Sequence, residues 1–115
     1  MPVARRRHLI SVQEPEVEHT MDPEIAKAIH ERKLLRLSYG GGARVVEPYV
    51  YGACETHELL RAYQVSGYSS SRATGWKLFR VEEITDLLVL DKRFGEPRDG
   101  YMRNDPCMEV VYAEV

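Results

Sequence analysis

The stretch from residue 34 to residue 84, LLRLSYGGGARVVEPYVYGACETHELLRAYQVSGYSSSRATGWKLFRVEEI, decides the fold of this 115-residue chain. Gly40-Gly41-Gly42 separates two apolar runs, and glycine adopts positive φ without steric cost, so the triplet predicts a tight hairpin. Pro48 follows a β-branched pair and marks a strand edge or a bulge. Further along, alternating runs flank the Ser-rich loop 67–75. This pattern of turn residues between alternating runs predicts short antiparallel strands.

Five strands follow from the alternation and the turn residues, over residues 34–39, 44–51, 58–66, 76–82 and 87–90. In the third, Leu60 and Ala62 share one face, and Leu59, Arg61 and Tyr63 lie on the other. A short helix precedes them. Asp22-Pro23 supplies an N-cap and a first-turn proline, and Ile25, Ala28 and Ile29 form one apolar stripe. We therefore predict a mainly β (α+β) fold, a small five-stranded Sm-like or SH3-like bent barrel with one N-terminal capping helix.

The two ends of the chain show weaker patterns. Residues 1–20 have no clear period and predict a flexible tail, while the proposed domain spans 21–96. Residues 97–115 predict a loop and then an edge strand, formed on the barrel or on a second copy of the chain. No apolar run approaches the roughly 20 residues of a membrane helix, and no secretory signal is evident. These features favour a cytoplasmic protein with Cys54 and Cys107 as free thiols.

Positive charge collects in the middle of the chain. Residues 32–81 contain eight basic and three acidic side chains, a net charge of +5, although the whole chain carries −2. A basic domain between acidic flanks predicts an anionic partner.

The candidate ligand-binding residues are basic or aromatic side chains of the predicted strands. Arg61 and Tyr63 share a face and could bind a phosphate and stack a base, or simply form a surface contact. Trp76 either stacks a base or closes the barrel. Lys77 and Arg80 are expected on opposite faces of their strand. Arg36 and Arg44 are expected to face each other across the first hairpin, with Glu47 as a partner for either.

Enzymatic patterns are missing. The four histidines show no metal-ligand spacing, the serines have no nucleophile-elbow context, and no Lys-Ser/Thr follows the three glycines. We therefore expect no enzyme activity, no metal and no cofactor.

The order and spacing of four segments resemble the WYL domain of bacterial regulators. The segments are AIHERKLLRLSYGGG, RVVEPY, LLRAYQV and WKLFRVEEI, and the likeness covers roughly residues 21–96. The resemblance implies an Sm-like barrel from transcription factors, CRISPR-associated proteins or other defence proteins, which senses nucleotides or single-stranded nucleic acid. Lys77 takes a position where the family usually has arginine, Glu83 takes one where it often has arginine, and Glu58-Leu59-Leu60 replaces the three letters of the family name.

Two functions are consistent with the sequence. The first is a regulatory module that senses a negatively charged effector, either single-stranded DNA or RNA or a nucleotide. The second is a protein-interaction or homodimerisation module without a small ligand, supported by the apolar stretches 87–90 and 110–115.

Overall fold

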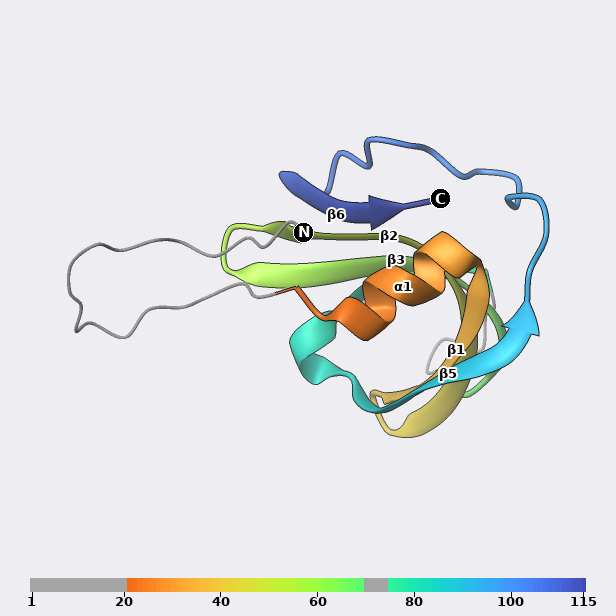
Figure 1. Cartoon of the computed structure of the whole chain (residues 1–115). Helices are drawn as coiled ribbons and strands as arrows, with labels where there is room; N and C mark the ends of the chain where they lie inside the picture. Colours follow the sequence, from red (N-terminus) through yellow and green to blue (C-terminus); the bar gives the residue numbers. More distant parts are fainter. Residues whose placement is uncertain (1–20, 70–74) are drawn as a thin grey trace.

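The computed structural model describes residues 21–69 and 75–115, so the expectation of a flexible tail over residues 1–20 lies outside the described residues. The described chain is mainly β, with an antiparallel sheet of six strands and one α-helix (Figure 1). None of the described helices is long and apolar enough to cross a membrane. The elements follow in the order α1 (Pro23–Glu31), β1 (Lys33–Tyr39), β2 (Gly42–Cys54), β3 (His57–Gly67), β4 (Gly75–Arg80), a 3-10 turn η1 (Val81–Glu83), β5 (Thr85–Arg93) and β6 (Val110–Glu114).

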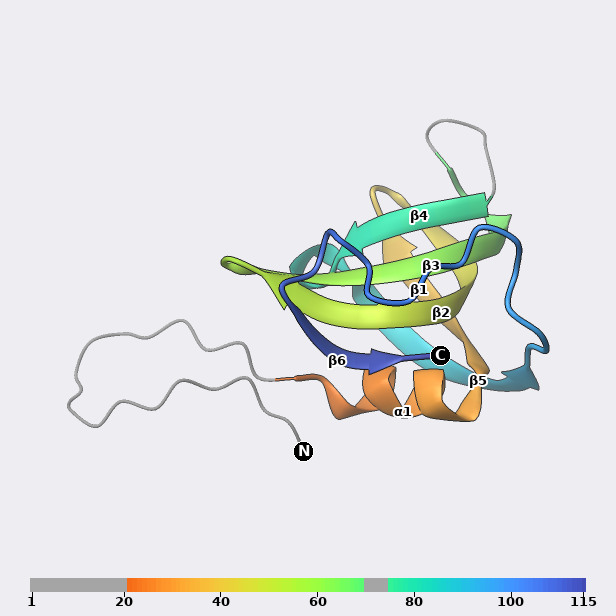
Figure 2. The same ribbon diagram turned by 90° about the horizontal axis from the view of Figure 1, so that it is seen from above.

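The long strand β2 organises the sheet. The strand order is β4-β3-β2-β1-β5, and β6 is a further partner of β2. β1 pairs with the first residues of β2, from Gly42 to Val46, whereas β6 pairs with the later residues, from Val50 to Ala53. β3 runs beside β2 from Arg44 to Cys54, with two register shifts that mark bulges. A bulge bends a strand. Figure 2 shows β2 as a curved strand, and this curvature lets it pair with β1, β3 and β6.

The helix forms as its sequence predicts. The Asp22 carboxylate accepts a hydrogen bond from the Glu24 N–H at 2.9 Å, and Pro23 occupies the first turn. Ile25, Ala28 and Ile29 are almost fully buried against the sheet. The helix ends at Arg32, whose left-handed backbone has a φ of 55°. Figures 1 and 2 show α1 beside β6 and β5, where its apolar stripe covers the main core.

Apolar side chains pack on both faces of the sheet. Leu60, Ala62 and Phe79 face the main core beneath α1. A second cluster, built around Tyr49, Val50 and Met108, includes Leu59, Tyr63, Trp76 and Tyr101. The chain between β5 and β6 crosses this second face (Figure 2), so residues far apart in the sequence enclose it.

The expectation of five strands is wrong by one. β6 pairs with β2 of the same chain and completes six strands in the described residues. The predicted strand 76–82 ends at Arg80 because the 3-10 turn begins at Val81. The predicted strand 87–90 extends to Thr85 and Arg93, because the pairing with β1 continues to both residues across two register shifts.

Gly52 permits the close approach of β6 to β2. A β-carbon at this position would collide with the carbonyl oxygen of Val110 and approach the Met108 sulfur to 2.9 Å. We expect Gly52→Ala to lower the free energy of unfolding by about 1–3 kcal/mol, the usual cost of overpacking a well-packed site. Urea denaturation measures this loss.

Gly95→Ala is the matched control, because a β-carbon at Gly95 meets no atom within 4 Å. It should leave the urea midpoint nearly unchanged. Equal stability of the two variants would contradict the tight pairing of β2 with β6.

Candidate functional site

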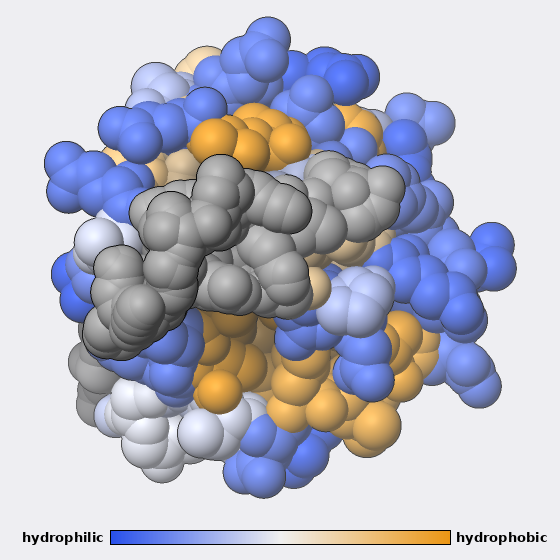
Figure 3. All heavy atoms as spheres, turned by 60° about the vertical axis from the view of Figure 1, so that its left-hand side comes forward, coloured by the Kyte–Doolittle hydropathy of each residue, from blue (hydrophilic) through white to orange (hydrophobic). Residues whose placement is uncertain are grey.

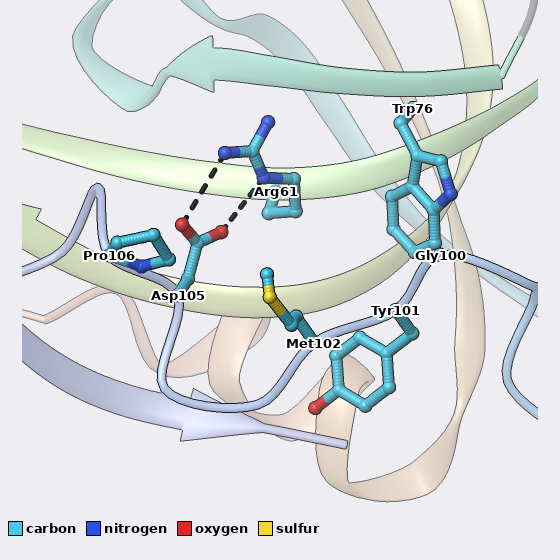
Figure 4. A pocket seen from close by; sticks show the side chains of 7 residues that line it. All are labelled: Arg61, Trp76, Gly100, Tyr101, Met102, Asp105 and Pro106. Carbon is cyan, nitrogen blue, oxygen red and sulfur yellow. Dashed lines mark hydrogen bonds and ion pairs between the residues drawn. The ribbon is translucent and has the colours of Figure 1, made fainter.

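A pocket of about 310 Å³ lies between the outer face of β3 and β4 and the segment that leads to β6. It is a cavity of a size that suits a small ligand. Figure 4 shows an ion pair on one side of the pocket and two aromatic rings on the other, with Met102 between them. The lining residues are Arg61, Trp76, Gly100, Tyr101, Met102, Asp105 and Pro106.

The ion pair joins Arg61 of β3 to Asp105. Arg61 Nε donates to Asp105 Oδ2 at 2.8 Å, and Arg61 Nη2 lies 3.4 Å from both Asp105 Oδ1 and the Cys107 sulfur. The Cys107 N–H donates a further hydrogen bond to Asp105 Oδ1 at 2.9 Å. The Asp105 side chain is only 6% exposed, whereas that of Arg61 is 26% exposed. The carboxylate is therefore the fixed member of the pair, and the guanidinium is the member that solvent or a ligand can reach.

Burial and hydrogen bonding act in opposite directions on Asp105. Burial raises the pKa of its carboxyl group, but the hydrogen bonds from Arg61 and Cys107 together lower that pKa below its ordinary value. The hydrogen bond to Asp105 in turn raises the pKa of Arg61. Both groups are consequently charged at neutral pH.

Trp76 and Tyr101 form the aromatic side of the pocket. Their rings are nearly parallel, at 17°, with centroids 6.4 Å apart. The indole N–H of Trp76 donates to the carbonyl oxygen of Asp99 at 2.8 Å. The indole forms edge-type contacts with Tyr63 and Tyr49, with centroid distances of 5.4 and 4.9 Å. These contacts hold Trp76 in one orientation, as a preformed stacking surface requires.

Gly100 is required where the chain passes Trp76. Its φ is +94°, and a β-carbon there would approach the Trp76 indole nitrogen to 2.9 Å. The C-terminal segment can therefore lie close to the ring only because residue 100 lacks a side chain.

Arg61 and Tyr63 share a face of β3, as the strand alternation predicts, and the register of β3 with β4 brings Trp76 beside them. Tyr63 lies opposite Trp76 in the pairing of β3 with β4. Arg61 precedes Tyr63 by two residues and lies on the same face of β3. A further cation, Arg98, lies over the Tyr63 ring at 4.4 Å and forms two hydrogen bonds with Glu47, at 3.0 and 2.9 Å. Sequence reasoning missed Arg98, Tyr101 and Asp105. Only their residue types could have marked them as site residues, because residues 97–106 show neither a helical nor a strand-like alternation of apolar residues.

Lys77 and Arg80 lie on opposite faces of β4, as expected. Lys77 is paired with buried Ala62, and its ammonium donates to the Ser69 hydroxyl at 3.2 Å. Arg80 is paired with Leu59 and forms a loose ion pair with Glu83 at 3.8 Å. Neither residue lines the pocket that contains Arg61.

The expectation that Arg36 and Arg44 face each other is wrong. A two-residue turn at Gly40-Gly41 sets Tyr39 opposite Gly42, so Arg36 lies opposite Val45 and Arg44 opposite Leu37. Arg36 is exposed, whereas Arg44 is buried in the core with 6% exposure. The two arginines therefore lie on opposite faces of the sheet.

Arg44 is held by uncharged groups. Its guanidinium donates to the Tyr39 carbonyl oxygen and to the Gln64 side-chain oxygen. It lies 5.4–5.5 Å from the ring centroids of Tyr39, Tyr68 and Phe79. Glu47, expected as its acidic partner, instead pairs with Arg98. Arg44 is a core residue stabilised by cation–π contacts.

Among the described residues, the basic side chains therefore form no single exposed patch. Arg61, Arg80 and Arg98 are each paired with a carboxylate, Arg44 is buried, and Lys77 faces the other way. Within residues 21–69 and 75–115, no cluster of histidine, cysteine or acidic side chains could hold a metal ion. Compared with known proteins, the chain matches no family model, no curated protein and no solved structure.

The Arg61–Asp105 pair predicts a defined pH dependence. The pKa of Asp105 in the folded protein lies below the unfolded value of about 3.9. The pair therefore stabilises the fold at neutral pH, and this contribution is lost as the pH falls through the folded pKa. We expect Asp105→Asn to be less stable than the wild type by about 1–3 kcal/mol at pH 7, with the difference narrowing below about pH 4.

Urea denaturation at several pH values measures that difference. Asp91→Asn provides the control. The Asp91 side chain is fully exposed, and its ion pair with Lys33 is long, at 4.0 Å. Its stability should follow the wild type throughout. A constant gap between Asp105→Asn and the wild type from pH 7 to pH 3 would show that the carboxylate charge is not what stabilises this contact.

Proposed function

We propose that this chain is a ligand-sensing module of a regulatory protein and that its pocket takes the base of a nucleotide or of single-stranded nucleic acid. The observation that carries this proposal is the placement of Arg61 opposite the paired rings of Trp76 and Tyr101 (Figure 4). Aromatic side chains stack on any base, and an arginine supplies hydrogen bonds to a base edge or a phosphate.

Arg61 keeps donors available for a ligand. Its Nε and Nη2 atoms are used by Asp105 and Cys107, whereas Nη1 has no acceptor among the residues that the structure describes. Figure 4 shows this third nitrogen directed away from Asp105. Asp105 thus orients the guanidinium and leaves two N–H groups for a phosphate oxygen or a base carbonyl. This arrangement recognises an anion by directed hydrogen bonds rather than by a surplus of charge.

Binding rather than catalysis fits the composition of the pocket. The seven lining residues include no serine, threonine, histidine, lysine or cysteine, the side chains that most often act as nucleophiles or bases. Asp105 is the lining carboxylate, and its hydrogen bonds to Arg61 and Cys107 keep it ionised and occupied. We propose a non-enzymatic role in the cytoplasm.

We further propose that the described sheet is the small barrel expected from the sequence. A long bent β2 with three neighbours, and a helix over the core, agree with the small Sm-like or SH3-like barrel that the resemblance to WYL domains implies. Arg61 and Trp76 lie on the outer face of β3 and β4, where the pocket is. Bacterial transcriptional or defence regulation is the setting that this resemblance favours.

Trp76 is the single tryptophan of the chain, so its fluorescence reports directly on the pocket. We expect single-stranded DNA, single-stranded RNA or a nucleotide to quench it. Arg61→Ala and Trp76→Leu should each weaken the binding of a labelled oligonucleotide by about tenfold or more, the value of one charged hydrogen bond or one stacked base. Fluorescence anisotropy of the oligonucleotide gives both affinities.

Lys27→Ala removes an exposed charge from α1 and serves as the control for net charge. It should bind like the wild type. Circular dichroism establishes that each variant is folded. If Arg61→Ala, folded, binds as tightly as the wild type, the pocket is not the site. The salt dependence then separates a strand that covers several phosphates, which loses affinity steeply with salt, from a mononucleotide.

The second candidate, an interaction module, has its own support. Leu88 of β5 is 53% exposed, and β5 ends the strand order of the described sheet. This edge is far in strand order from the pocket, so the two roles can be tested separately.

A further inference from the structure

Trp76, the stacking ring of the pocket, is oriented by neighbours from three separate parts of the chain. Tyr49 of β2 packs against it with a centroid distance of 4.9 Å, and Tyr63 of β3 with one of 5.4 Å. The carbonyl oxygen of Asp99 accepts the hydrogen bond of the indole N–H at 2.8 Å. The orientation of Trp76 therefore depends on what holds these three neighbours in place.

One carboxylate, that of Glu47 on β2, anchors the neighbours on the two strands. Glu47 Oε1 accepts a hydrogen bond from the Tyr49 hydroxyl at 3.0 Å. Arg98 Nε donates to the same oxygen at 3.0 Å, and Arg98 Nη2 donates to Oε2 at 2.9 Å. Two parallel hydrogen bonds fix both the position and the plane of a guanidinium. Held in this way, the guanidinium lies 4.4 Å from the centroid of the Tyr63 ring.

The same ion pair places the segment that follows Arg98. The N–H of Arg98 donates to the Tyr49 hydroxyl at 3.1 Å, and its carbonyl oxygen accepts from the N–H of Tyr101 at 3.1 Å. Asp99, whose carbonyl oxygen meets the indole, is the next residue in the chain. The ring of Tyr101 also packs against Tyr49, with centroids 5.1 Å apart. Anchoring Arg98 on Glu47 therefore positions the third neighbour of the indole and the second ring of the pocket as well.

We propose that Glu47 is a positioning residue of the pocket. Without touching the ligand, it fixes the stacking face of Trp76 through the two side chains that it binds. The Glu47 side chain is 7% exposed and does not line the pocket, so a ligand held between Arg61 and Trp76 does not contact it. The inference rests on the proposed function, because a fixed stacking face matters only where a base binds. A ring that is ordered before the ligand arrives loses little freedom on binding, and this raises affinity.

Glu47→Gln tests this role, because charge and positioning predict opposite signs. The amide keeps the size of the carboxylate, but its N–H₂ group faces the guanidinium of Arg98, which has donors only. By charge alone, removing a carboxylate near the pocket would strengthen the binding of an anionic oligonucleotide. Loss of positioning weakens it instead. We expect about a tenfold loss of affinity by fluorescence anisotropy, the value of one charge-assisted hydrogen bond.

The emission of Trp76 in the ligand-free, folded chain supplies a second readout. We expect acrylamide to quench it more strongly in Glu47→Gln than in the wild type, because the ring is less firmly packed. Glu58→Gln is the matched control, since Glu58 also accepts a hydrogen bond from a buried tyrosine, Tyr51, at 2.7 Å. Tyr51 belongs to the main core beneath α1. Glu58→Gln makes the same change in net charge and should keep the quenching and the affinity of the wild type.

A folded Glu47→Gln chain with wild-type quenching overturns the proposal, and so does an oligonucleotide affinity that is unchanged or tighter. If that variant does not fold, Arg98→Met takes its place. Arg98 is 44% exposed, and methionine removes its donors while keeping an apolar side chain against Tyr63. Quenching should rise in this variant too, and wild-type quenching would overturn the proposal. The quenching measurements contain no ligand, so a wild type that binds no oligonucleotide contradicts the proposed function without changing their outcome.

Discussion

The pairing of one long strand with three neighbours is the constraint on which this structure depends. β2 is 13 residues long and changes partner along its first edge, from β1 to β6, while β3 follows it on the other. A straight strand could not serve β1 and β6 in two different directions, so the bulge at Tyr49 of β2 is part of the fold. The close approach at Gly52 fixes β6 on the second half of β2. From there the rest of the C-terminal segment is drawn across the outer face.

That return of the chain creates the candidate site. Without residues 98–106, the outer face of β3 and β4 would present Arg61, Tyr63 and Trp76 as an exposed strip. With them, Asp105 neutralises Arg61, Arg98 stacks on Tyr63, and Tyr101 lies beside Trp76. A flat basic and aromatic surface becomes a neutral pocket with directed donors. The donors of this pocket are set by geometry and not by an excess of positive charge.

Local features of the sequence predicted the local structure well. The N-cap Asp22 and the stripe of Ile25, Ala28 and Ile29 predicted α1, and the alternation around Leu60 and Ala62 predicted the faces of β3, because both depend only on backbone periodicity. The partners of the charged side chains were not predictable. Arg61 meets Asp105 across 44 residues, and no short pattern encodes such a contact. The register of the first hairpin depends on how many glycines form the turn. Because Gly40 and Gly41 form it, Arg44 lies opposite Leu37 and points into the core.

The charge count over residues 32–81 shows the physical limit of such reasoning. Its sum treats Arg44, Arg61 and Lys77 alike, but burial removes the first from solvent, a carboxylate compensates the second, and the strand alternation turns the third to the other face. The pocket is lined by β3 and β4 on one side and by residues 100–106 on the other, and the pairing of β6 with β2 follows directly after that segment. Any ligand held between Trp76 and Arg61 binds only the docked form, so by mass action it stabilises the pairing of β6 with β2. A ligand that binds there adds to the stability of this docked arrangement to an extent that rises with its occupancy.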